Sequence, residues 1–167
     1  MYKFIFFIAL VLLSCKTTSY YIVRHAEKET STTNGTMTSD VPLSNAGKQR
    51  AEALKDLLAK ENIKHVFSTN YIRTKSTAQP LVDVIHIPIQ IYDPKDPQFI
   101  SQLKALNGNA LIIGHSNTVD DIVNELTGKK EIQSDLPDSA YGDLFVVKKK
   151  GKRITFERKH FGEQGPS

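Results

Sequence analysis

Residues 20–28, which read YYIVRHAEK, place an arginine and a histidine directly after a short apolar run. Aromatic and β-branched residues in such a run are typical of a buried strand. Polar side chains that follow the run therefore lie where the strand ends and a loop begins. In sheets of parallel strands, ligands bind beyond the carboxyl ends of the strands. We predict a strand over Tyr20–Val23 and regard Arg24 and His25 as candidate site residues.

Short apolar runs alternate with helix-length amphipathic stretches along the rest of the chain, a pattern typical of βα units. Residues 44–61 predict a helix capped by Ser44 or Asn45. The consecutive apolar residues Ala110–Ile113 predict a strand that is buried on both faces. Further strands are expected near 66–67 and over 87–92, further helices over 71–81, 99–106 and 118–126, and a hairpin of strands over 143–147 and 153–157.

These elements predict an α/β fold, a three-layer α/β/α sandwich with a mostly parallel sheet and an antiparallel margin. Two residues give signals for helix ends. Pro80 predicts that the helix over 71–81 bends or stops early, because proline lacks an N–H group. Gly128 predicts the end of the helix that precedes it.

The first fifteen residues have the pattern of an export signal. Lys3 gives a positive start and Phe4–Leu13 is an unbroken apolar run. A helix that spans a bilayer needs about 20 apolar residues, so this shorter run indicates a signal peptide. Its ending at Ser14-Cys15 resembles the lipobox of bacterial lipoproteins, in which the cysteine is lipidated and becomes the new N-terminus. The predicted organisation is a signal over 1–15, a tether over 16–19, a domain over 20–162 and a flexible tail over 163–167.

Lipidation of Cys15 would anchor an exported domain to a membrane of the bacterial cell envelope, on the periplasmic side or at the outer membrane. Cys15 is the only cysteine, so the chain has no intramolecular disulfide. The alternative interpretation is a cleaved secretory signal with an incidental cysteine.

The charge of the chain is mildly basic. Lys and Arg number 22 against 18 Asp and Glu, and loss of Lys3 would lower the formal net charge of +4 to +3. The clearest basic cluster is Lys148–Lys150 with Lys152 and Arg153, around a predicted turn at Gly151. No aromatic residue is interleaved to stack on bases, so we interpret the cluster as a solvated turn rather than a nucleic-acid surface. We expect a monomer that does not bind nucleic acid.

Two more predicted strands are followed by basic side chains. His115 comes directly after the strand Ala110–Ile113 and Gly114, and Arg73 comes shortly after the strand near 66–67. Together with Arg24 and His25 they would meet at one edge of the sheet and repel one another. A phosphate dianion relieves this repulsion, and its oxygens match the paired donors of arginine. The sequence therefore predicts a phosphate-binding crevice.

The same residues resemble the motifs of the histidine phosphatase, or phosphoglycerate-mutase-like, superfamily. The resemblance runs from about residue 20 to residue 147, with the motifs in the family's order. Arg24-His25-Ala26 is similar to the family's first motif, Arg-His-Gly. Residues 42–47 are similar to its second motif, which is Pro-Leu-Ser/Thr with a downstream glycine. Ser68 with Arg73-Thr74 and Thr77-Ala78 is similar to its third motif, and Gly114-His115 is similar to its fourth.

The resemblance implies that His25 is the nucleophile and forms a phosphohistidine that water hydrolyses. It implies that Arg24, Arg73 and His115 bind the phosphate, with no metal and no cofactor. A neutral imidazole is nucleophilic near pH 7, which suits this role, and His115 should bind best when protonated. The short chain is similar to the phosphohistidine-phosphatase-like branch. The implied enzyme is a metal-independent phosphatase that acts on phosphomonoesters or phosphohistidine, in a small molecule or a phosphoprotein.

The family's general acid has no clear counterpart. Mutases carry a Glu-Arg-His segment and acid phosphatases an aspartate after the second histidine, but Ser116 follows His115 here. Glu27, Asp93 and Asp96 are the nearest candidates by position. A carboxyl acid contributes about 10²- to 10⁴-fold, so its absence favours substrates with good leaving groups.

Two alternatives to an efficient phosphatase follow. One is a catalytically weak phosphate-binding or signalling lipoprotein. The other is a phosphoglycerate mutase, against which the missing Glu-Arg-His segment and missing cap insertions argue. The polar residues 29–41, near the predicted nucleophile, fit either a lid or a flexible loop.

Overall fold

The structure, a computed structural model, describes residues 16–29 and 40–163. Six strands form one sheet in the order β3-β2-β4-β1-β5-β6. The elements are β1 (Thr17–Arg24), α1 (Asn45–Leu58), β2 (Ile63–Ser68), α2 (Ile72–Ile85), β3 (Ile89–Ile91), α3 (Phe99–Ala105), β4 (Asn109–Gly114), α4 (Val119–Thr127), β5 (Asp143–Lys150) and β6 (Arg153–His160).

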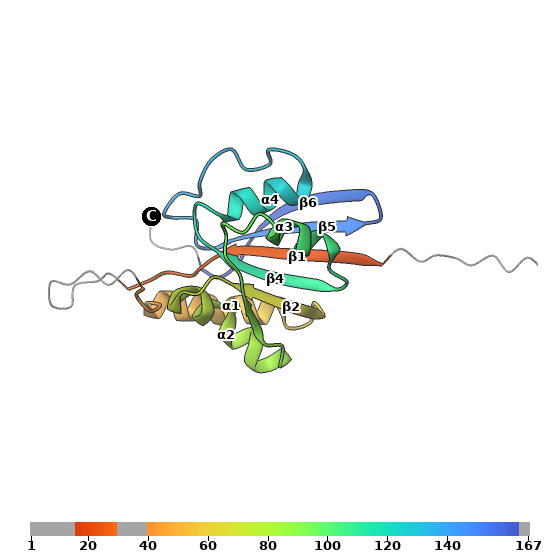
Figure 1. The fold of residues 1–167 in the computed structure, drawn as a ribbon. Helices are drawn as coiled ribbons and strands as arrows, with labels where there is room; N and C mark the ends of the chain where they lie inside the picture. Colours follow the sequence, from red (N-terminus) through yellow and green to blue (C-terminus); the bar gives the residue numbers. More distant parts are fainter. Residues whose placement is uncertain (1–15, 30–39, 164–167) are drawn as a thin grey trace, which may run out of the picture.

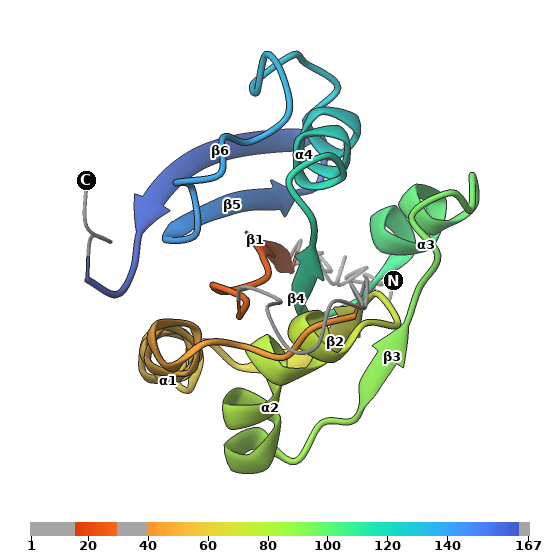
Figure 2. The ribbon, with the colours of Figure 1, turned by 90° about the vertical axis from the view of Figure 1, so that its left-hand side faces the viewer.

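The elements form three layers. Helices α1 and α2 cover one face of the sheet, and α3 and α4 cover the other (Figures 1 and 2). Strands β1 to β4 pair in parallel, whereas β5 and β6 add an antiparallel margin beside β1. This architecture confirms the predicted α/β/α sandwich.

Both faces of the central strands are buried. Tyr20 and Ile22 of β1 belong to the core beneath α3 and α4, whereas Tyr21 and Val23 belong to the core beneath α1 and α2. Neighbouring residues of a strand point to opposite faces, so burial on both sides requires a continuous apolar run. This explains why the sequence shows unbroken apolar runs at β1 and β4.

The signals for helix ends have different outcomes. Ser44 caps α1 by accepting a hydrogen bond from the Gly47 N–H group, and Gly128 ends α4 in the left-handed conformation with φ of 69°. The expectation of an early stop at Pro80 was wrong, because α2 continues past it to Ile85, and the alternative of a bend stays a prediction. Because proline has no N–H group, the carbonyl of Ser76 lacks its helical hydrogen-bond partner. Ser76 is only half-buried.

The predicted tether is part of the folded domain. Thr17, Thr18 and Ser19 pair with Lys150, Lys149 and Lys148 of β5, and Thr18 and Ser19 are buried. The prediction stopped at Tyr20 because polar residues carry no apolar signal, whereas the ladder to β5 extends the strand. The predicted signal, most of the polar loop after Glu29 and residues 164–167 lie outside the described residues. In the described part of the chain, no helix is both long and apolar enough to cross a membrane.

Candidate active site

The ends of three parallel strands meet at one edge of the sheet. Arg24 of β1 lies beside Gly114 of β4, and Ser68 of β2 lies beside Ile113. The N–H group of His25 donates to the carbonyl oxygen of Gly114 at 3.0 Å, which continues the ladder past β1. The loops that follow β1, β2 and β4 therefore begin side by side at this edge of the sheet.

Arg24, His25, Arg73 and His115 line one cleft of about 410 Å³ at this edge. The ring centroids of His25 and His115 are 5.4 Å apart. The sequence pattern predicted these four residues, but it did not predict the other residues that line the cleft. The other lining residues are Lys28, Tyr71, Pro94, Ser116, Asn117, Thr118 and Asp138.

The His25 ring is fixed in one tautomer. Its Nδ1 lies 2.8 Å from the carbonyl oxygen of Ala26, which can only accept, so Nδ1 carries the proton and Nε2 the lone pair. Burial, opposed by this hydrogen bond and assisted by the charges of Arg24, Arg73 and His115, lowers the pKa of His25 to about 3. The imidazole is therefore neutral at pH 7.

The loop after β1 is attached to α2 through Thr77. The Ala26 N–H group donates to Thr77 Oγ1 at 2.9 Å, and this hydroxyl donates to the Arg73 carbonyl at 2.8 Å. The methyl group of Ala26 packs with Leu43 and Ala51. Thr77 thus links the loop that carries His25 to the helix that carries Arg73.

Each arginine lies over a tyrosine ring. The Arg24 guanidinium is 4.2 Å from the ring centroid of Tyr141, and that of Arg73 is 4.4 Å from the ring centroid of Tyr71. Stacking on an aromatic face holds the guanidinium plane in a defined orientation. The sequence reasoning missed both tyrosines, although Tyr71 lies two residues before Arg73.

Arg24 is buried and contacts the loop between α4 and β5. Its Nη1 donates to the Pro137 carbonyl at 3.0 Å, and its Nη2 lies 3.1 Å from Asp138 Oδ1. Its Nε is buried without a hydrogen-bond partner among the described residues. A buried donor left unpaired costs about 1–3 kcal/mol, so an acceptor that reached it would be stabilised.

His115 lies between Thr69 and Arg73. Its Nε2 is 2.9 Å from Thr69 Oγ1, whose own proton goes to Thr74 Oγ1, so Nε2–H donates. Its Nδ1 then accepts from Arg73 Nη2 at 3.4 Å. Burial, followed by the charges of Arg73 and Arg24, lowers the pKa of His115 to about 4. This histidine is also neutral at pH 7.

Glu27 does not line the cleft. Both of its carboxylate oxygens accept hydrogen bonds from Arg50, at 2.6 to 2.9 Å. Arg50 also donates to the carbonyls of Phe161 and Glu163, so the pair ties the loop after β1 to α1 and to the chain beyond β6. The suggestion of Glu27 as the general acid is corrected here, because its oxygens are engaged on the other side of this loop.

Among the described residues, Asp138 is the carboxylate that lines the cleft. Its side chain is 99% exposed, and its loop is attached to the segment after β4 by a bond from the Leu136 N–H group to the Ser116 carbonyl at 2.8 Å. The other two candidates, Asp93 and Asp96, accept instead from nearby backbone N–H groups. Sequence reasoning missed Asp138 because it belongs to no motif and reaches the cleft only through the path of its loop.

The cleft suits an anion with several oxygen acceptors. Arg24, Arg73 and Lys28 bring positive charge to it, and His25 and His115 add ring nitrogens. Within residues 16–29 and 40–163, His, Cys, Asp and Glu side chains nowhere gather in the threes that a metal site would need. This donor set matches the hydrogen-bonding needs of phosphate oxygens.

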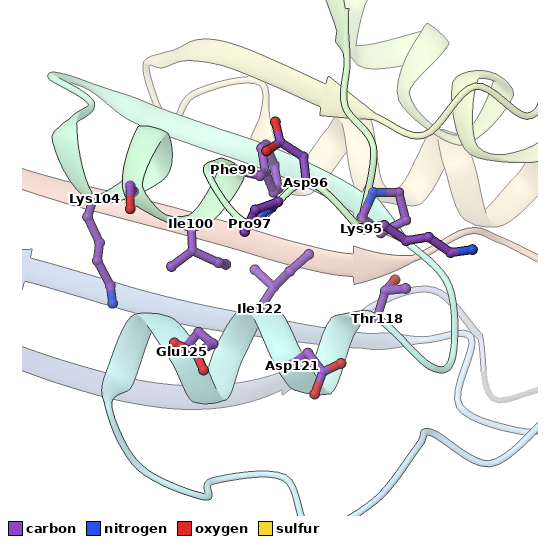
Figure 3. Close-up of a pocket in the computed structure, with 12 residues that line it drawn as sticks. Lys95, Asp96, Pro97, Phe99, Ile100, Lys104, Thr118, Asp121, Ile122 and Glu125 are labelled. Atoms are coloured by element: carbon purple, nitrogen blue, oxygen red, sulfur yellow. The ribbon is translucent and has the colours of Figure 1, made fainter.

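A second hollow of about 560 Å³ adjoins the cleft, between α3 and α4 (Figure 3). The two share Pro94 and Thr118. Ile100 and Ile122 point toward each other in its floor, and Asp121 lies at its margin (Figure 3). The hollow therefore extends the concave surface beyond the cleft, along α3 and α4.

Gly47 lets α1 approach the loop after β1. A Cβ at this position would overlap the carbonyl oxygen of Glu27, which also accepts the Ser44 N–H group. We expect Gly47→Ala to lower the free energy of unfolding by about 2 kcal/mol or more, because backbone must move rather than a side chain. Thermal unfolding measures this effect, with Lys48→Ala in the same helical turn as control. Equal melting temperatures for the two variants would contradict the prediction.

The two neutral histidines should make folding sensitive to acid. In the unfolded chain a histidine protonates near its ordinary pKa of 6.5, but folded His25 and His115 do so at about 3 and about 4. Below about pH 6.5 the unfolded chain binds protons that the folded chain does not, so stability falls as pH falls. We expect the urea midpoint in phosphate-free buffer to drop between about pH 7 and pH 5, and to drop less in His25→Gln/His115→Gln. An equal drop in both proteins would refute this linkage.

The first comparison with known proteins concerns the N-terminal part of the domain. Residues 20–94 match the model of the histidine phosphatase superfamily (branch 1). This span contains Arg24, His25 and Arg73 and ends before His115. No curated protein matches the chain.

Solved structures share the fold. SixA from Agrobacterium tumefaciens, assigned as a phosphohistidine phosphatase, is 22% identical, with a TM-score of 0.64 over 87% of this chain and 97% of that one. The protein histidine phosphatase SixA complexed with tungstate is 19% identical, with a TM-score of 0.66 over 85% and 96%. A phosphoglycerate mutase from Bacillus anthracis is 13% identical, with a TM-score of 0.59 over 86% and 93%. Since these neighbours differ in activity, the fold alone does not select one reaction.

Proposed function

We propose that this chain is a member of the histidine phosphatase superfamily and hydrolyses phosphomonoesters or phosphohistidine through a phosphohistidine intermediate on His25. One observation carries the proposal: a neutral His25, with its proton fixed on Nδ1, lies in a cleft with Arg24, Arg73 and His115. The match of residues 20–94 to the superfamily supports it.

The first step transfers the phosphoryl group to the enzyme. The Nε2 lone pair of His25 attacks phosphorus, and the bond from phosphorus to the leaving oxygen or nitrogen breaks, with the electron pair going to the leaving group. The proton stays on Nδ1 and continues to donate to the Ala26 carbonyl oxygen, which stabilises the positive charge of the phosphorylated ring. Water then attacks phosphorus, the N–P bond breaks, and its electron pair returns to Nε2.

The arginines would neutralise the charge of the transferring group. Phosphoryl transfer depends mainly on positioning and on charge stabilisation of the phosphate oxygens. Arg24 and Arg73 provide paired donors whose planes are held by tyrosine rings. Burial and the charges of Arg73 and Arg24 lower the pKa of His115, and a dianion between the arginines would offset these charges and so favour the protonated, donating form of this histidine.

Asp138 is our candidate for the general acid. A phosphate oxygen on Arg24 would replace Asp138 Oδ1 as the partner of Nη2 and leave the carboxyl group at the margin of the cleft, beside the leaving group. From there it could donate a proton to the leaving oxygen. Its high exposure means that the ion pair with Arg24 holds it weakly.

A phosphate-binding lipoprotein with weak catalysis is the second candidate function. The observation in its favour is that the carboxylate at the cleft is exposed rather than held in place. A mutase finds no support in the described residues that line the cleft, since no second acid accompanies Asp138 among them.

The deciding experiment uses residues 16–167, which contain every element of the described fold. Hydrolysis of p-nitrophenyl phosphate is measured, and quenched samples are tested for acid-labile phosphate on His25. Turnover with label on His25 is expected. Phosphate binding with neither turnover nor label would select the binding lipoprotein instead.

We also propose that Cys15 is lipidated, so that the domain is anchored to a membrane of the cell envelope. The support is a lone cysteine after a short apolar run, two residues before β1 begins. Labelling with radioactive palmitate in a bacterial host should mark the full chain in the membrane fraction. Cys15→Ala should lose the label, whereas retained label would exclude this site.

A further inference from the structure

We propose that the end of the molecule opposite the cleft is a membrane-contact surface that binds anionic lipid headgroups. This basic end consists of Lys16, Lys129, Lys148, Lys150, Lys152 and Arg153, all of them exposed. It goes beyond the phosphatase proposal, and its orientation rests on the proposed anchor at Cys15.

The fold gathers these residues from distant parts of the chain. Strand β1 starts beside the turn between β5 and β6, because Thr17 pairs with Lys150 (Figure 1). Lys129, just after α4, lines the same surface hollow as Lys152. In the sequence only the cluster around the turn is visible, and it was interpreted as a solvated turn. The fold adds Lys16 and Lys129 to it.

Among the described residues, basic side chains outnumber acidic ones at the basic end. Within the described part of the chain, none of the six residues forms an ion pair within 4.0 Å. The acidic groups at this end are few: Glu131 lines the hollow with Lys129, and Glu61 accepts a hydrogen bond from the Tyr21 hydroxyl. Ile154, which follows Arg153, is 41% exposed and adds an apolar contact. By contrast, Arg24 and Arg73 at the cleft have Asp138 and Asp40 nearby.

The position of Cys15 decides between possible polyanions. A lipid on Cys15 would be separated from β1 only by Lys16, so the end where β1 starts would be held at the bilayer. A basic patch next to a lipid anchor adds electrostatic attraction to anionic lipids. Each Lys or Arg near an anionic surface contributes about fivefold in affinity. No feature of the described residues would hold a nucleic acid at the basic end in the same way.

This orientation has a consequence for the substrate. Strand β1 runs from Thr17 to Arg24, so the cleft lies about 23 Å from the basic end at about 3.3 Å for each step along the strand. The cleft therefore faces the aqueous compartment. We infer that the substrates are phosphorylated groups in solution or on other proteins, rather than headgroups of the membrane that holds the anchor.

The test uses residues 16–167, which lack Cys15, so that lipidation plays no part. Binding is measured by co-sedimentation with phosphatidylcholine vesicles, with and without phosphatidylglycerol. The variant Lys150→Gln/Lys152→Gln/Arg153→Gln is compared with Lys48→Gln/Lys75→Gln/Lys159→Gln, which removes the same charge at the cleft end. We expect binding only to phosphatidylglycerol vesicles, about a hundredfold weaker in the first variant and little changed in the second.

Two results would overturn the proposal. Equal weakening by the two variants would mean that net charge alone drives binding, and absence of binding by the wild-type domain would mean that the basic end is only solvated. Vesicle-bound protein should also hydrolyse p-nitrophenyl phosphate as fast as free protein, and inhibition on binding would refute the outward orientation. Because binding and turnover are read separately, failure of the phosphatase proposal would leave the vesicle result interpretable.

Discussion

Replacement of His25 by alanine is expected to lower the turnover of p-nitrophenyl phosphate by about 10⁴- to 10⁶-fold, as loss of a covalent nucleophile does in other enzymes. The reason is that no other described residue combines a fixed proton on Nδ1 with a lone pair on Nε2 between two arginines. The arginines and His115 remain in the variant, so phosphate should still bind. Initial rates, phosphate affinity and acid-labile label are measured together.

Two further variants make this result specific. His86→Asn removes a histidine far from the cleft, at a left-handed position with φ of 56° that asparagine tolerates, and should keep full activity. His25→Asn keeps an N–H donor for the Ala26 carbonyl and should fold even if the alanine variant does not. Turnover by His25→Asn within tenfold of wild type would refute the role of His25.

Replacement of Asp138 by asparagine should lower the hydrolysis of an alkyl phosphate by about 10²- to 10⁴-fold, the usual contribution of a general acid. An alkoxide leaving group needs a proton, whereas p-nitrophenolate leaves without one, so hydrolysis of p-nitrophenyl phosphate should change little. The measured quantity is the ratio of kcat/KM for the two substrates. The variant also removes a negative charge from Arg24, so phosphate should bind as tightly or more tightly.

Asp135→Asn is the matched control for Asp138. It removes an exposed carboxylate of the same loop that does not line the cleft. It should leave the substrate ratio unchanged. If Asp138→Asn lowers both substrates equally, or neither, Asp138 is not the acid, and reliance on good leaving groups becomes the better account of this cleft.

Much of the fold could be predicted because its signals are local. The unbroken apolar residues of β1 and β4 reflect burial on both faces of the sheet, and the cap at Ser44 is a contact within one helical turn. The predictions of the fold failed where a structure depends on contacts between segments that are far apart in the sequence. Thr18 and Ser19 carry no apolar signal, yet they lie in β1 because β5 pairs with them.

The candidate site divides in the same way. Arg24, His25, Arg73 and His115 could be expected together from the sequence, because each follows a strand and parallel strands end at one edge. Glu27 follows His25 closely in the sequence, but its side chain is taken by Arg50 of α1. The position of Glu27 in the sequence does not predict its pairing with Arg50, because the direction of a side chain after a strand depends on the residues that pack against it.

The sequence by itself determined the order of strands and helices and the basic residues at the strand ends, because periodicity and position within an element are properties of neighbouring residues. Only the tertiary structure decided that Asp138 lines the cleft, that two tyrosine rings stack on its arginines, that Glu27 pairs with Arg50 instead, and that lysines from three segments form one basic end. These arrangements depend on contacts between residues far apart in the chain, and such contacts exist only once the sheet and its helical layers have formed.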